Sequence, residues 1–335
     1  MQFTEEQRMI RDMARGFARE KLLPGAAERD RTSHFPKSEI TEMGRLGLMG
    51  MLVPEAHGGA GADHVSLVLA IAEIAGGDAG CATVMSVQNS LICMALLRFG
   101  NDAQKEQFLT PCAAGAMIGA FALTEPQAGS DAAALACTAR KEGSEYVLNG
   151  TKQFISSGKY GDLALVFAVT DKSAGKRGIS AFLVPTDTPG YIVSAVEHKM
   201  GQHSSDTAQI TFEEMRIPEA YRLGEEGEGY KIALANLEGG RLGIAAQALG
   251  LGEAAYEAAL AYAAERESFG KPIHQHQAVG FRLADMATQL QAARLMVLHA
   301  ADLRDRGEPC LKEACMAKLY ASEAAERVAR EASQV

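Results

Sequence analysis

The 335-residue sequence contains no tryptophan, and its six cysteines are scattered along the chain. No CxxC pair occurs among them, which argues against a disulfide framework and against a structural zinc site. Several cysteines have apolar neighbours, as buried and unreactive thiols usually do. The histidines show neither an HExxH motif nor a grouping with cysteine, so no metal site is predicted. The cysteines are Cys81, Cys93, Cys112, Cys137, Cys310 and Cys315.

Long apolar runs and an excess of positive charge are also lacking. Hydrophobic residues make up 47% of the chain, yet no apolar run reaches the length of a membrane span, which predicts a protein with no membrane partner. The amphipathic start from Phe3 to Phe17 lacks the order of a signal peptide and predicts a cytoplasmic location. The formal net charge of -9 argues against nucleic-acid binding. It does not argue against an anionic cofactor, because a few local arginines and helix N-termini suffice to bind phosphate.

The periodicity of the chain divides it into three parts. From Phe3 to about Leu109, apolar residues recur at helical spacing and predict a bundle of about five helices. Between Ile118 and Pro218 short strands follow one another without intervening helices, which favours an antiparallel sheet or barrel. Helical patterns return beyond Gly229. We therefore predict an α+β protein with an N-terminal helical domain at 1–112, a middle antiparallel β domain at 113–222 and a C-terminal helical domain at 223–335.

The predicted C-terminal helices carry apolar residues over a length greater than one domain core can cover. Uncovered apolar faces of this kind favour a subunit interface, so a homo-oligomer is predicted. The residues on which this prediction depends are Leu283, Met286, Leu290, Leu295 and Leu298.

The segment GAFALTEPQAGSD, from Gly119 to Asp131, is an apolar run that breaks abruptly into a turn. Proline fixes its own φ within this turn, and Gly129 permits a ligand to approach the backbone closely. The hydroxyls of Thr124 and Ser130 can reach carbonyl or phosphate oxygens. On these residues alone the segment is either a ligand-binding loop or a plain structural turn.

Two other motifs have a simpler interpretation. The string GLGEAA from Gly250 to Ala255 fits a GxGxxA dinucleotide pattern, but the preceding residues are typical of a helix and no strand with a ribose-binding acid follows. We interpret its glycines as residues that ease helix packing. Ser130 lies in AGSD and not in a GxSxG elbow, which argues against a serine hydrolase.

Six further motifs occur in a fixed order along the chain, from about Phe3 to its last residue. Together with the loop they resemble the acyl-CoA dehydrogenase family, most closely its short-chain, butyryl-CoA-type members. The resemblance implies a flavoprotein that oxidises acyl-CoA thioesters of short or branched-short chain to 2-enoyl-CoA, and that passes electrons to an electron-transfer flavoprotein. The motifs are VPEAHGGAG (53–61), LNGTKQFISS (148–157), GISAFLVP (178–185), FEEMRIP (212–218), ERESFGKPI (265–273) and HQAVGFRLADMA (276–287).

The resemblance also implies contacts with the flavin ring. Phe121, Leu123 and Thr124 match positions whose backbone and hydroxyl groups meet the pyrimidine ring. Phe154 and Ser156 match a segment that lies against the flavin, in which the aromatic residue is often tryptophan. Phenylalanine can still stack there with a smaller face. Packing of Phe154 in the core is the alternative.

A second group of residues is implied to reach the FAD diphosphate and adenosine in a neighbouring subunit. It consists of Arg266, Ser268, Phe269 and Gln277, and it requires a dimer or tetramer of identical chains. A guanidinium group binds phosphate in a bidentate manner, which suits Arg266 to this role. An exposed arginine at a helix end is the alternative.

Three residues are implied to meet the substrate. Ser130 matches a position near CoA, Glu238 an acidic position near the pantetheine, and Arg241 an arginine that lines the acyl-CoA channel. Glu238 and Arg241 could equally be solvated helix charges.

The resemblance also shows what the sequence lacks. Dehydrogenation needs a carboxylate that removes the α-proton. In most of the family this is a Glu in a C-terminal Tyr-Glu-Gly-Thr segment, expected beyond Val335. In a minority it lies directly before the helix arginine, where this chain has Gly240. Glu238 is turned about 200° around a helix from that position and is a poor substitute.

No catalytic residue is therefore predicted within the 335 residues, and the chain is expected to be part of a longer enzyme. The final helical pattern continues to Ser333 without a stop signal, in keeping with that expectation. Two alternatives remain open: a flavin oxidase or monooxygenase on the same scaffold, and a catalytically silent protein that binds CoA or flavin.

Overall fold

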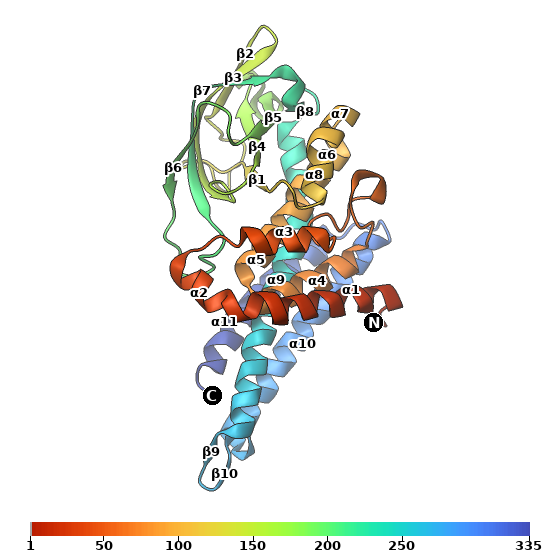
Figure 1. Ribbon diagram of the computed structural model, residues 1–335, viewed down its shortest axis with the longest axis vertical. Coiled ribbons are helices and arrows are strands. Elements are labelled where there is room, and N and C mark those ends of the chain that lie inside the picture. The colour runs from red at the N-terminus through yellow and green to blue at the C-terminus, as the bar shows by residue number, and fades with distance from the viewer. Residues whose placement is uncertain (1) are drawn as a thin grey trace. The chain divides into compact units, whose positions relative to one another are not determined.

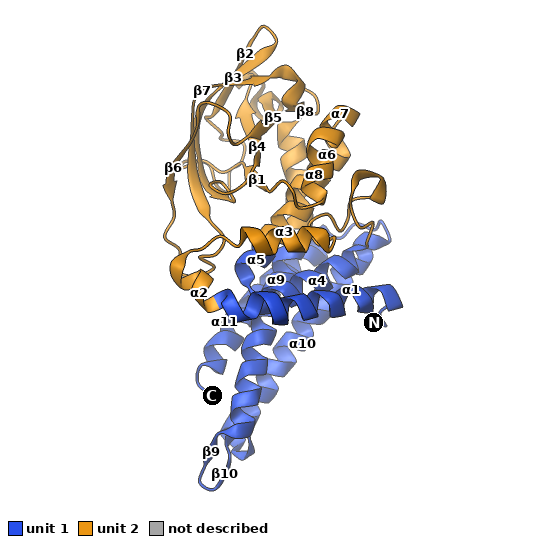
Figure 2. Ribbon diagram, viewed as in Figure 1, with its two compact units in different colours: residues 1–26, 63–83, 241–335 blue, residues 27–62, 84–240 orange. Residues whose placement is uncertain are grey.

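The computed structural model describes residues 2–335 and consists of two compact units (Figure 2). Unit 1 combines the chain up to Ala26 with Asp63–Thr83 and Arg241–Val335. Unit 2 combines Ala27–Ala62 with Val84–Gly240. The two ends of the chain therefore share one unit, and the eight-stranded sheet belongs to the other.

Unit 1 is built from helices (Figure 1). The first helix begins with a capping box, in which the Thr4 side chain accepts a hydrogen bond from the backbone N–H of Gln7 while the Gln7 side chain accepts one from the N–H of Thr4. The Asp63 side chain caps α4 in a similar way. The helices that lie wholly or partly in this unit are α1 (Glu5–Phe17), the π-helical turn η1 (Ala18–Leu22), α2 (Leu23–Thr32), α4 (His64–Gly77), α5 (Ala79–Val87), α9 (Gly229–Glu265), α10 (Gln277–Asp305) and α11 (Leu311–Ala332).

Glycine allows α4 and α9 to pack closely within unit 1. A Cβ atom on Gly250 would lie 2.0 Å from the carbonyl oxygen of Ala72, a distance that no side chain can occupy. On the other side of α9, a Cβ atom on Gly252 would lie 2.7 Å from Leu290 Cδ2. Both glycines are in the interior of a helix. The prediction that the GxGxxA string serves helix packing is therefore confirmed.

A short hairpin joins α9 to α10. Its strands are β9 (Glu267–Ser268) and β10 (Lys271–Pro272), and the 3-10 turn η7 (Ile273–Gln275) follows them. Gly270 at the tip has a φ of 75°, a value that glycine adopts without strain. The hairpin interrupts what would otherwise be one long helical run.

The helical part of unit 2 lies against its sheet (Figure 1). Contrary to the expectation from the sequence, the stretch Ala79–Phe99 is long and apolar enough to cross a membrane by length and composition alone. Of its most apolar 18 residues, 72% are buried inside the protein, as expected of a core helix. In unit 2 this stretch continues from α5 through the π-helical segment η3 (Gln88–Cys93) into α6 (Met94–Phe99). The other helical elements are α3 (Lys37–Arg45), η2 (Glu55–His57), α7 (Asp102–Gln104), η4 (Lys105–Leu109), α8 (Thr110–Ala113), η5 (Lys172–Gly178) and η6 (Glu219–Tyr221).

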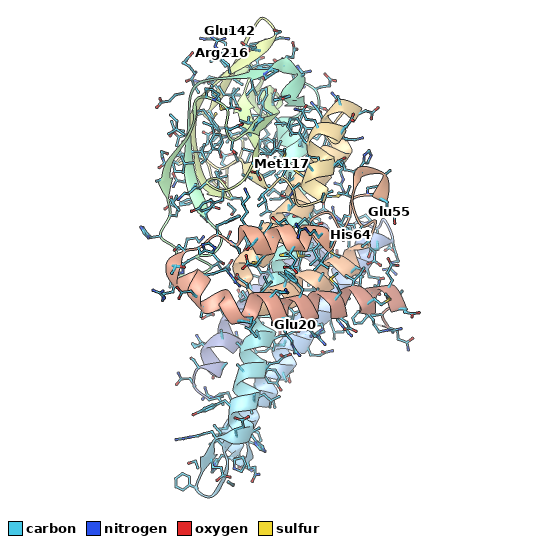
Figure 3. All side chains as sticks on the ribbon, in the orientation of Figure 1. Glu20, Glu55, His64, Met117, Glu142 and Arg216 are labelled. Atoms are coloured by element: carbon cyan, nitrogen blue, oxygen red, sulfur yellow. The ribbon has the colours of Figure 1, made fainter. Side chains whose placement is uncertain are left out.

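The sheet of unit 2 has the strand order β6-β7-β3-β2-β4-β5-β8, with β1 paired to β4. Most neighbours are antiparallel, as predicted, whereas β1 and β2 each pair with β4 in parallel. At one end of the sheet Glu142 and Arg216 form an ion pair of 2.8 Å (Figure 3). The strands are β1 (Gly119–Ala122), β2 (Thr138–Glu142), β3 (Glu145–Ser156), β4 (Leu163–Val169), β5 (Ile179–Pro185), β6 (Tyr191–Val196), β7 (Thr207–Pro218) and β8 (Arg222–Leu223).

Apolar residues cover both faces of the central strands. Leu165 and Phe167 of β4 pack with Ile92 of η3, whereas Val166 packs with Phe182 and residues of β7 on the opposite face. This two-sided burial explains why β4 and β5 are continuous apolar runs rather than alternating patterns. The sheet is thus held rigidly at the end of β1, where the candidate loop begins.

Candidate functional site

The loop after β1 is a closed turn. Within β1, Phe121 is in register with Leu165 of β4, and its ring centroid lies 5.0 Å from that of Phe167. Glu125 and Ala128 then exchange two backbone hydrogen bonds of 3.0 Å, which fold the chain back on itself. The next residues of the loop, up to Ser130, are exposed or border open space. The loop therefore offers backbone and hydroxyl groups to a ligand.

Strand β3 holds this loop by two contacts. The backbone N–H of Gln153 donates to the carbonyl oxygen of Thr124 over 2.8 Å, and Lys152 Nζ donates to the carbonyl oxygen of Leu123 over 3.1 Å. The structure therefore brings the predicted residues of the loop close to those of β3. These are Phe121, Leu123 and Thr124 on one segment and Phe154 and Ser156 on the other.

Phe154 is presented to the outside by the backbone. The pairing of β3 with β7 shifts register between Lys152 and Ile155, and Phe154 has a φ of 59°, an uncommon value for an aromatic residue. Its side chain is 62% exposed, while Ile155 beside it is buried. The structure excludes the core-packing interpretation of Phe154. A bulge that turns an aromatic side chain outward is typical of a binding site.

A buried ion pair lies behind the loop, and the sequence analysis missed it. Lys152 Nζ and Glu125 Oε1 are 2.7 Å apart, and both side chains are almost completely inaccessible to solvent. Burial raises the pKa of Glu125, but the charge of Lys152 and several hydrogen bonds outweigh it and hold that pKa below its ordinary value. No local sequence signal marks this contact, because the two residues are 27 positions apart.

The same carboxylate orders the far side of the loop. It accepts hydrogen bonds from the backbone N–H groups of Ala136 and Cys137, at 2.6 and 3.0 Å, and from Gln127 Nε2 at 2.7 Å. Glu125 therefore joins both ends of the segment between the turn and β2.

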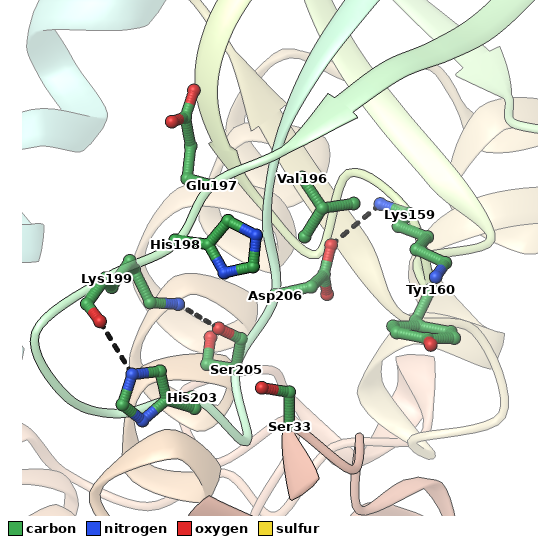
Figure 4. Close-up of a pocket in the computed structure, with 10 residues that line it drawn as sticks. All are labelled: Ser33, Lys159, Tyr160, Val196, Glu197, His198, Lys199, His203, Ser205 and Asp206. Atoms are coloured by element: carbon green, nitrogen blue, oxygen red, sulfur yellow. Dashed lines mark hydrogen bonds between the residues drawn. The ribbon is translucent and has the colours of Figure 1, made fainter.

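A small cavity of about 190 Å³ lies elsewhere in unit 2 (Figure 4). Asp206 Oδ2 accepts a hydrogen bond of 2.8 Å from the backbone N–H of Lys159, and Asp206 Oδ1 has no partner among the described residues. Burial raises the pKa of Asp206. Gln153 Nε2 donates to Glu197, which links the cavity wall to the Phe154 segment. The lining residues are Ser33, Lys159, Tyr160, Val196, Glu197, His198, Lys199, His203, Ser205 and Asp206.

His203, which lines this cavity, pairs with Asp30 of α2. His203 Nδ1 lies 3.0 Å from Asp30 Oδ2, and His203 Nε2 lies 2.6 Å from the carbonyl oxygen of Lys199. The hydrogen bond with Asp30 raises the pKa of His203 and lowers that of Asp30. This pair ties α2 to the connection between β6 and β7.

The predicted diphosphate and adenosine residues gather at the hairpin of unit 1. Arg266 and Gln277 are exposed and flank the hairpin, and Ser268 lies on β9. The Phe269 side chain is 94% exposed at the tip, where the backbone has a φ of 52°. Its ring meets His276 edge to face at 6.0 Å, and His276 Nε2 lies 3.0 Å from the carbonyl oxygen of Ser268. The hairpin thus presents a cation, a hydroxyl, an amide and an aromatic ring together.

The predicted substrate residues on α9 are half-buried. Glu238 and Arg241 are three residues apart and are therefore neighbours on the helix surface. A Cβ atom on Gly240 would lie 3.4 Å from Leu91 Cδ2 and 3.8 Å from Ser90 Oγ, which are ordinary contact distances. A Cβ atom therefore fits at Gly240.

The apolar residues on which the oligomer prediction depended are mostly covered within the chain itself. Leu283, Met286, Leu290 and Leu298 are buried, because α10 packs against α11 and α4, and only Leu295 is largely exposed. The expectation that all five exceed one core was therefore wrong. Other apolar side chains of α10 and α11 are at least 48% exposed, namely Phe281, Leu311, Met316 and Leu319.

Three models of one family match the chain in succession. The N-terminal domain of acyl-CoA dehydrogenase matches residues 4–116, the middle domain residues 120–215, and the C-terminal domain residues 227–335.

Curated relatives align with the whole chain. An acyl-CoA dehydrogenase of Bacillus subtilis (strain 168) is 49% identical over 335 residues, which are 100% of this chain and 88% of that protein. The mitochondrial short-chain specific acyl-CoA dehydrogenase of Bos taurus is 46% identical over 100% of this chain and 81% of its own length.

Solved structures agree with these relatives. Butyryl-CoA dehydrogenase from Megasphaera elsdenii superposes with a TM-score of 0.97 at 43% identity, covering 100% of this chain and 88% of that one. A chain in the structure described as the electron transferring flavoprotein of Acidaminococcus fermentans superposes with a TM-score of 0.98 at 46% identity, with the same coverage. The protein therefore belongs to the acyl-CoA dehydrogenase family of oxidoreductases.

Proposed function

We propose that this protein uses FAD to oxidise short or branched-short acyl-CoA thioesters to 2-enoyl-CoA, and that it passes the electrons to an electron-transfer flavoprotein. The observation that carries the proposal is the exposed Phe154, which the bulge of β3 turns outward beside Leu123 and Thr124. The likeness to a butyryl-CoA dehydrogenase supports the substrate class. The likeness to a chain in an electron transferring flavoprotein structure supports the electron acceptor.

The loop and β3 fit a flavin ring. Thr124 has a half-buried hydroxyl group, and Phe154 has an exposed aromatic face. A Cβ atom on Gly129 would meet no atom within 4 Å, so open space borders the loop backbone. We assign the pyrimidine edge to Phe121, Leu123 and Thr124, and the ring face to the Phe154 segment with Ser156. FAD bound there would supply the hydride acceptor for the β-hydrogen of the substrate.

The hairpin of unit 1 fits the other half of FAD. Arg266 can bind a diphosphate in a bidentate manner, because its guanidinium is exposed and always charged. Ser268 and Gln277 supply hydrogen-bonding groups, and Phe269 supplies an exposed ring for the adenine. We propose that the hairpin serves the cofactor of a neighbouring copy, so that the functional protein is a cytoplasmic dimer or tetramer. A 94% exposed phenylalanine supports this view, because an uncovered ring of this size is typical of an interface.

The protein must promote loss of the α-proton from the substrate thioester in two ways. Hydrogen bonds to its carbonyl oxygen stabilise negative charge as the α-proton leaves, and exclusion of water strengthens them. We propose that Ser130, Glu238 and Arg241 bind the CoA portion and line the channel. All three are polar, and the loop around Ser130 is accessible.

The α-proton needs a positioned carboxylate, and Gly240 cannot provide one. Glu238 lies on another side of the helix from Gly240. We propose that the base is a glutamate that residues 1–335 do not include. A base placed at Gly240 should then substitute for it.

The test is anaerobic bleaching of the FAD-loaded protein by butyryl-CoA, followed by absorbance. The 335-residue chain should bind FAD but bleach slowly, and Gly240→Glu should bleach about 100- to 10,000-fold faster, since that is the usual contribution of a general base. Helical glycine costs roughly 1 kcal/mol relative to alanine, and a Cβ atom fits at Gly240, so the variant should fold. Gly240→Gln is the matched control, because it has the same size without a base.

Each outcome of this test is informative. Fast bleaching by the unmodified chain would show that the base lies within it. Equal rates for Gly240→Glu and Gly240→Gln would contradict proton abstraction from this position of α9. Reoxidation by molecular oxygen as fast as by an electron-transfer flavoprotein would favour an oxidase on the same scaffold. A purified protein without any yellow colour after incubation with FAD would refute the proposal as a whole.

A further inference from the structure

The buried pair Lys152 and Glu125 is unusual for a strand of this sheet. Lys152 is in register with Ile210 of β7, and its side chain is fully buried. Removal of two charges from water is costly, and a well-packed apolar pair of similar volume often gives equal or greater stability. Stability alone therefore does not explain why a lysine and a glutamate occupy these positions.

The side-chain hydrogen bonds of Lys152 and Glu125 converge on the loop after β1. Lys152 Nζ donates to Leu123 O at 3.1 Å and to Glu125 Oε1 at 2.7 Å. The Glu125 carboxylate in turn holds Gln127, Ala136 and Cys137. The pair thus fixes the start and the end of the loop relative to β3.

The residues next to Leu123 and Lys152 include those that we assign to the flavin. The backbone of Gln153, directly after Lys152, donates to Thr124 O, directly after Leu123. Phe154 follows, turned outward by the bulge. A shift of Leu123 away from Lys152 would therefore move Thr124 relative to the aromatic ring of Phe154.

We propose that Lys152 and Glu125 are positioning residues for the flavin, which set the separation between Thr124 and Phe154 and place a charged pair behind the pyrimidine edge. This inference rests on the proposed function, because it takes FAD as the ligand. It predicts the direction in which each substitution shifts the midpoint potential of the flavin. Loss of the lysine charge leaves an anion that disfavours added electrons, whereas loss of the glutamate charge leaves a cation that favours them.

The experiment compares Lys152→Met, Glu125→Gln and Lys152→Arg in the full chain. FAD affinity is measured by quenching of flavin fluorescence, the midpoint potential by anaerobic equilibration with reference dyes, and folding by circular dichroism. Lys152→Met should weaken FAD binding by about tenfold or more, because the charged donor that holds Leu123 and its neighbour Thr124 in place is lost, and it should lower the midpoint potential. Glu125→Gln should raise the potential, and Lys152→Arg should restore most of the affinity.

The control is Lys141→Met, which removes a lysine from the exposed ion pair with Glu219 in the same unit. It should leave both affinity and potential unchanged. A purely structural role would lower thermal stability in both charge variants without shifting their potentials in opposite directions.

The outcomes separate this inference from the proposed function. An unmodified chain that binds no FAD would overturn both. An unmodified chain that binds FAD, with folded variants of the same affinity and potential, would overturn the inference alone. If Lys152→Met does not fold, Glu125→Gln and Lys152→Arg decide: the wild-type potential in Glu125→Gln would overturn the inference.

Discussion

Replacement of Glu253 by glutamine should remove a pH dependence from the stability of unit 1. Glu253 lies on α9 with 21% of its side chain exposed, and its Oε1 atom is 2.5 Å from Nη2 of Arg294. The pair borders a cavity of about 320 Å³ whose walls also carry Glu73 and Glu257. Burial raises the pKa of Glu253 to about 7, the two neighbouring carboxylates add to the rise, and Arg294 opposes it.

The magnitude of this pH dependence follows from the linkage between proton binding and folding. A carboxyl group whose pKa is higher in the folded than in the unfolded protein binds its proton more tightly when folded, so stability is lost as the pH rises. For Glu253 the window extends from its ordinary pKa of 4.5 to about 7. At about 1.4 kcal/mol per pKa unit, this difference corresponds to roughly 3 kcal/mol of unfolding free energy. The stabilising contribution is fully present below the window and absent above it.

The assay is urea unfolding from pH 4.5 to 8, followed by circular dichroism. The free energy of the wild type relative to Glu253→Gln should fall by roughly 3 kcal/mol across this range, because glutamine can still accept a hydrogen bond from Arg294 but has no proton to lose. Glu326→Gln is the control: its side chain is 72% exposed on α11, where it pairs with Arg330, so its curve should stay parallel to that of the wild type. If the unfolding free energies of Glu253→Gln and the wild type change in parallel with pH, the reasoning is refuted.

Two further predictions concern the hairpin and helix packing. Arg266→Ala should release FAD on gel filtration, with a loss of about 2 kcal/mol of binding free energy, whereas Arg330→Ala in an exposed helical ion pair should retain it; equal retention would contradict the diphosphate assignment. Gly250→Ala should lower the unfolding free energy by about 1–3 kcal/mol, because its Cβ atom would lie 2.0 Å from the carbonyl oxygen of Ala72. Gly16→Ala, whose Cβ atom meets nothing within 4 Å, should instead raise it by about 0.5–1 kcal/mol. If Gly250→Ala and Gly16→Ala shift the urea midpoint in the same direction, this explanation of the packing is excluded.

The elements predicted best from the sequence are those with long, uniform patterns. The helical pattern predicted beyond Gly229 begins with α9 (Gly229–Glu265), because this stretch is rich in alanine and leucine and contains no proline. The continuous apolar runs of β4 and β5 were also recognised, because burial on both faces demands them. By contrast, β2 shows no apolar strand pattern, since it has the sequence TARKE and is mostly exposed.

The site was predicted less completely than the fold. The motif resemblance predicted Thr124, Phe154 and the hairpin residues as site residues. It did not predict that Phe154 lies at a bulge with a positive φ. That conformation depends on register with β7, which lies more than 50 residues away in the sequence. The Lys152–Glu125 pair was missed for a related reason, since a contact between residues 27 positions apart has no local signature.

The buried helix Ala79–Phe99 has a consequence for biosynthesis. Its core residues Ile92 and Leu96 pack with Leu163, Leu183 and Ile232, which the ribosome adds much later. At about 5 to 20 residues per second, a gap of about 130 residues leaves this apolar helix without its last partners for roughly 7 to 27 s. During that time it has the length and hydropathy of a membrane span. A nascent chain of this protein should therefore depend on chaperones that cover apolar helices until translation has passed Ile232.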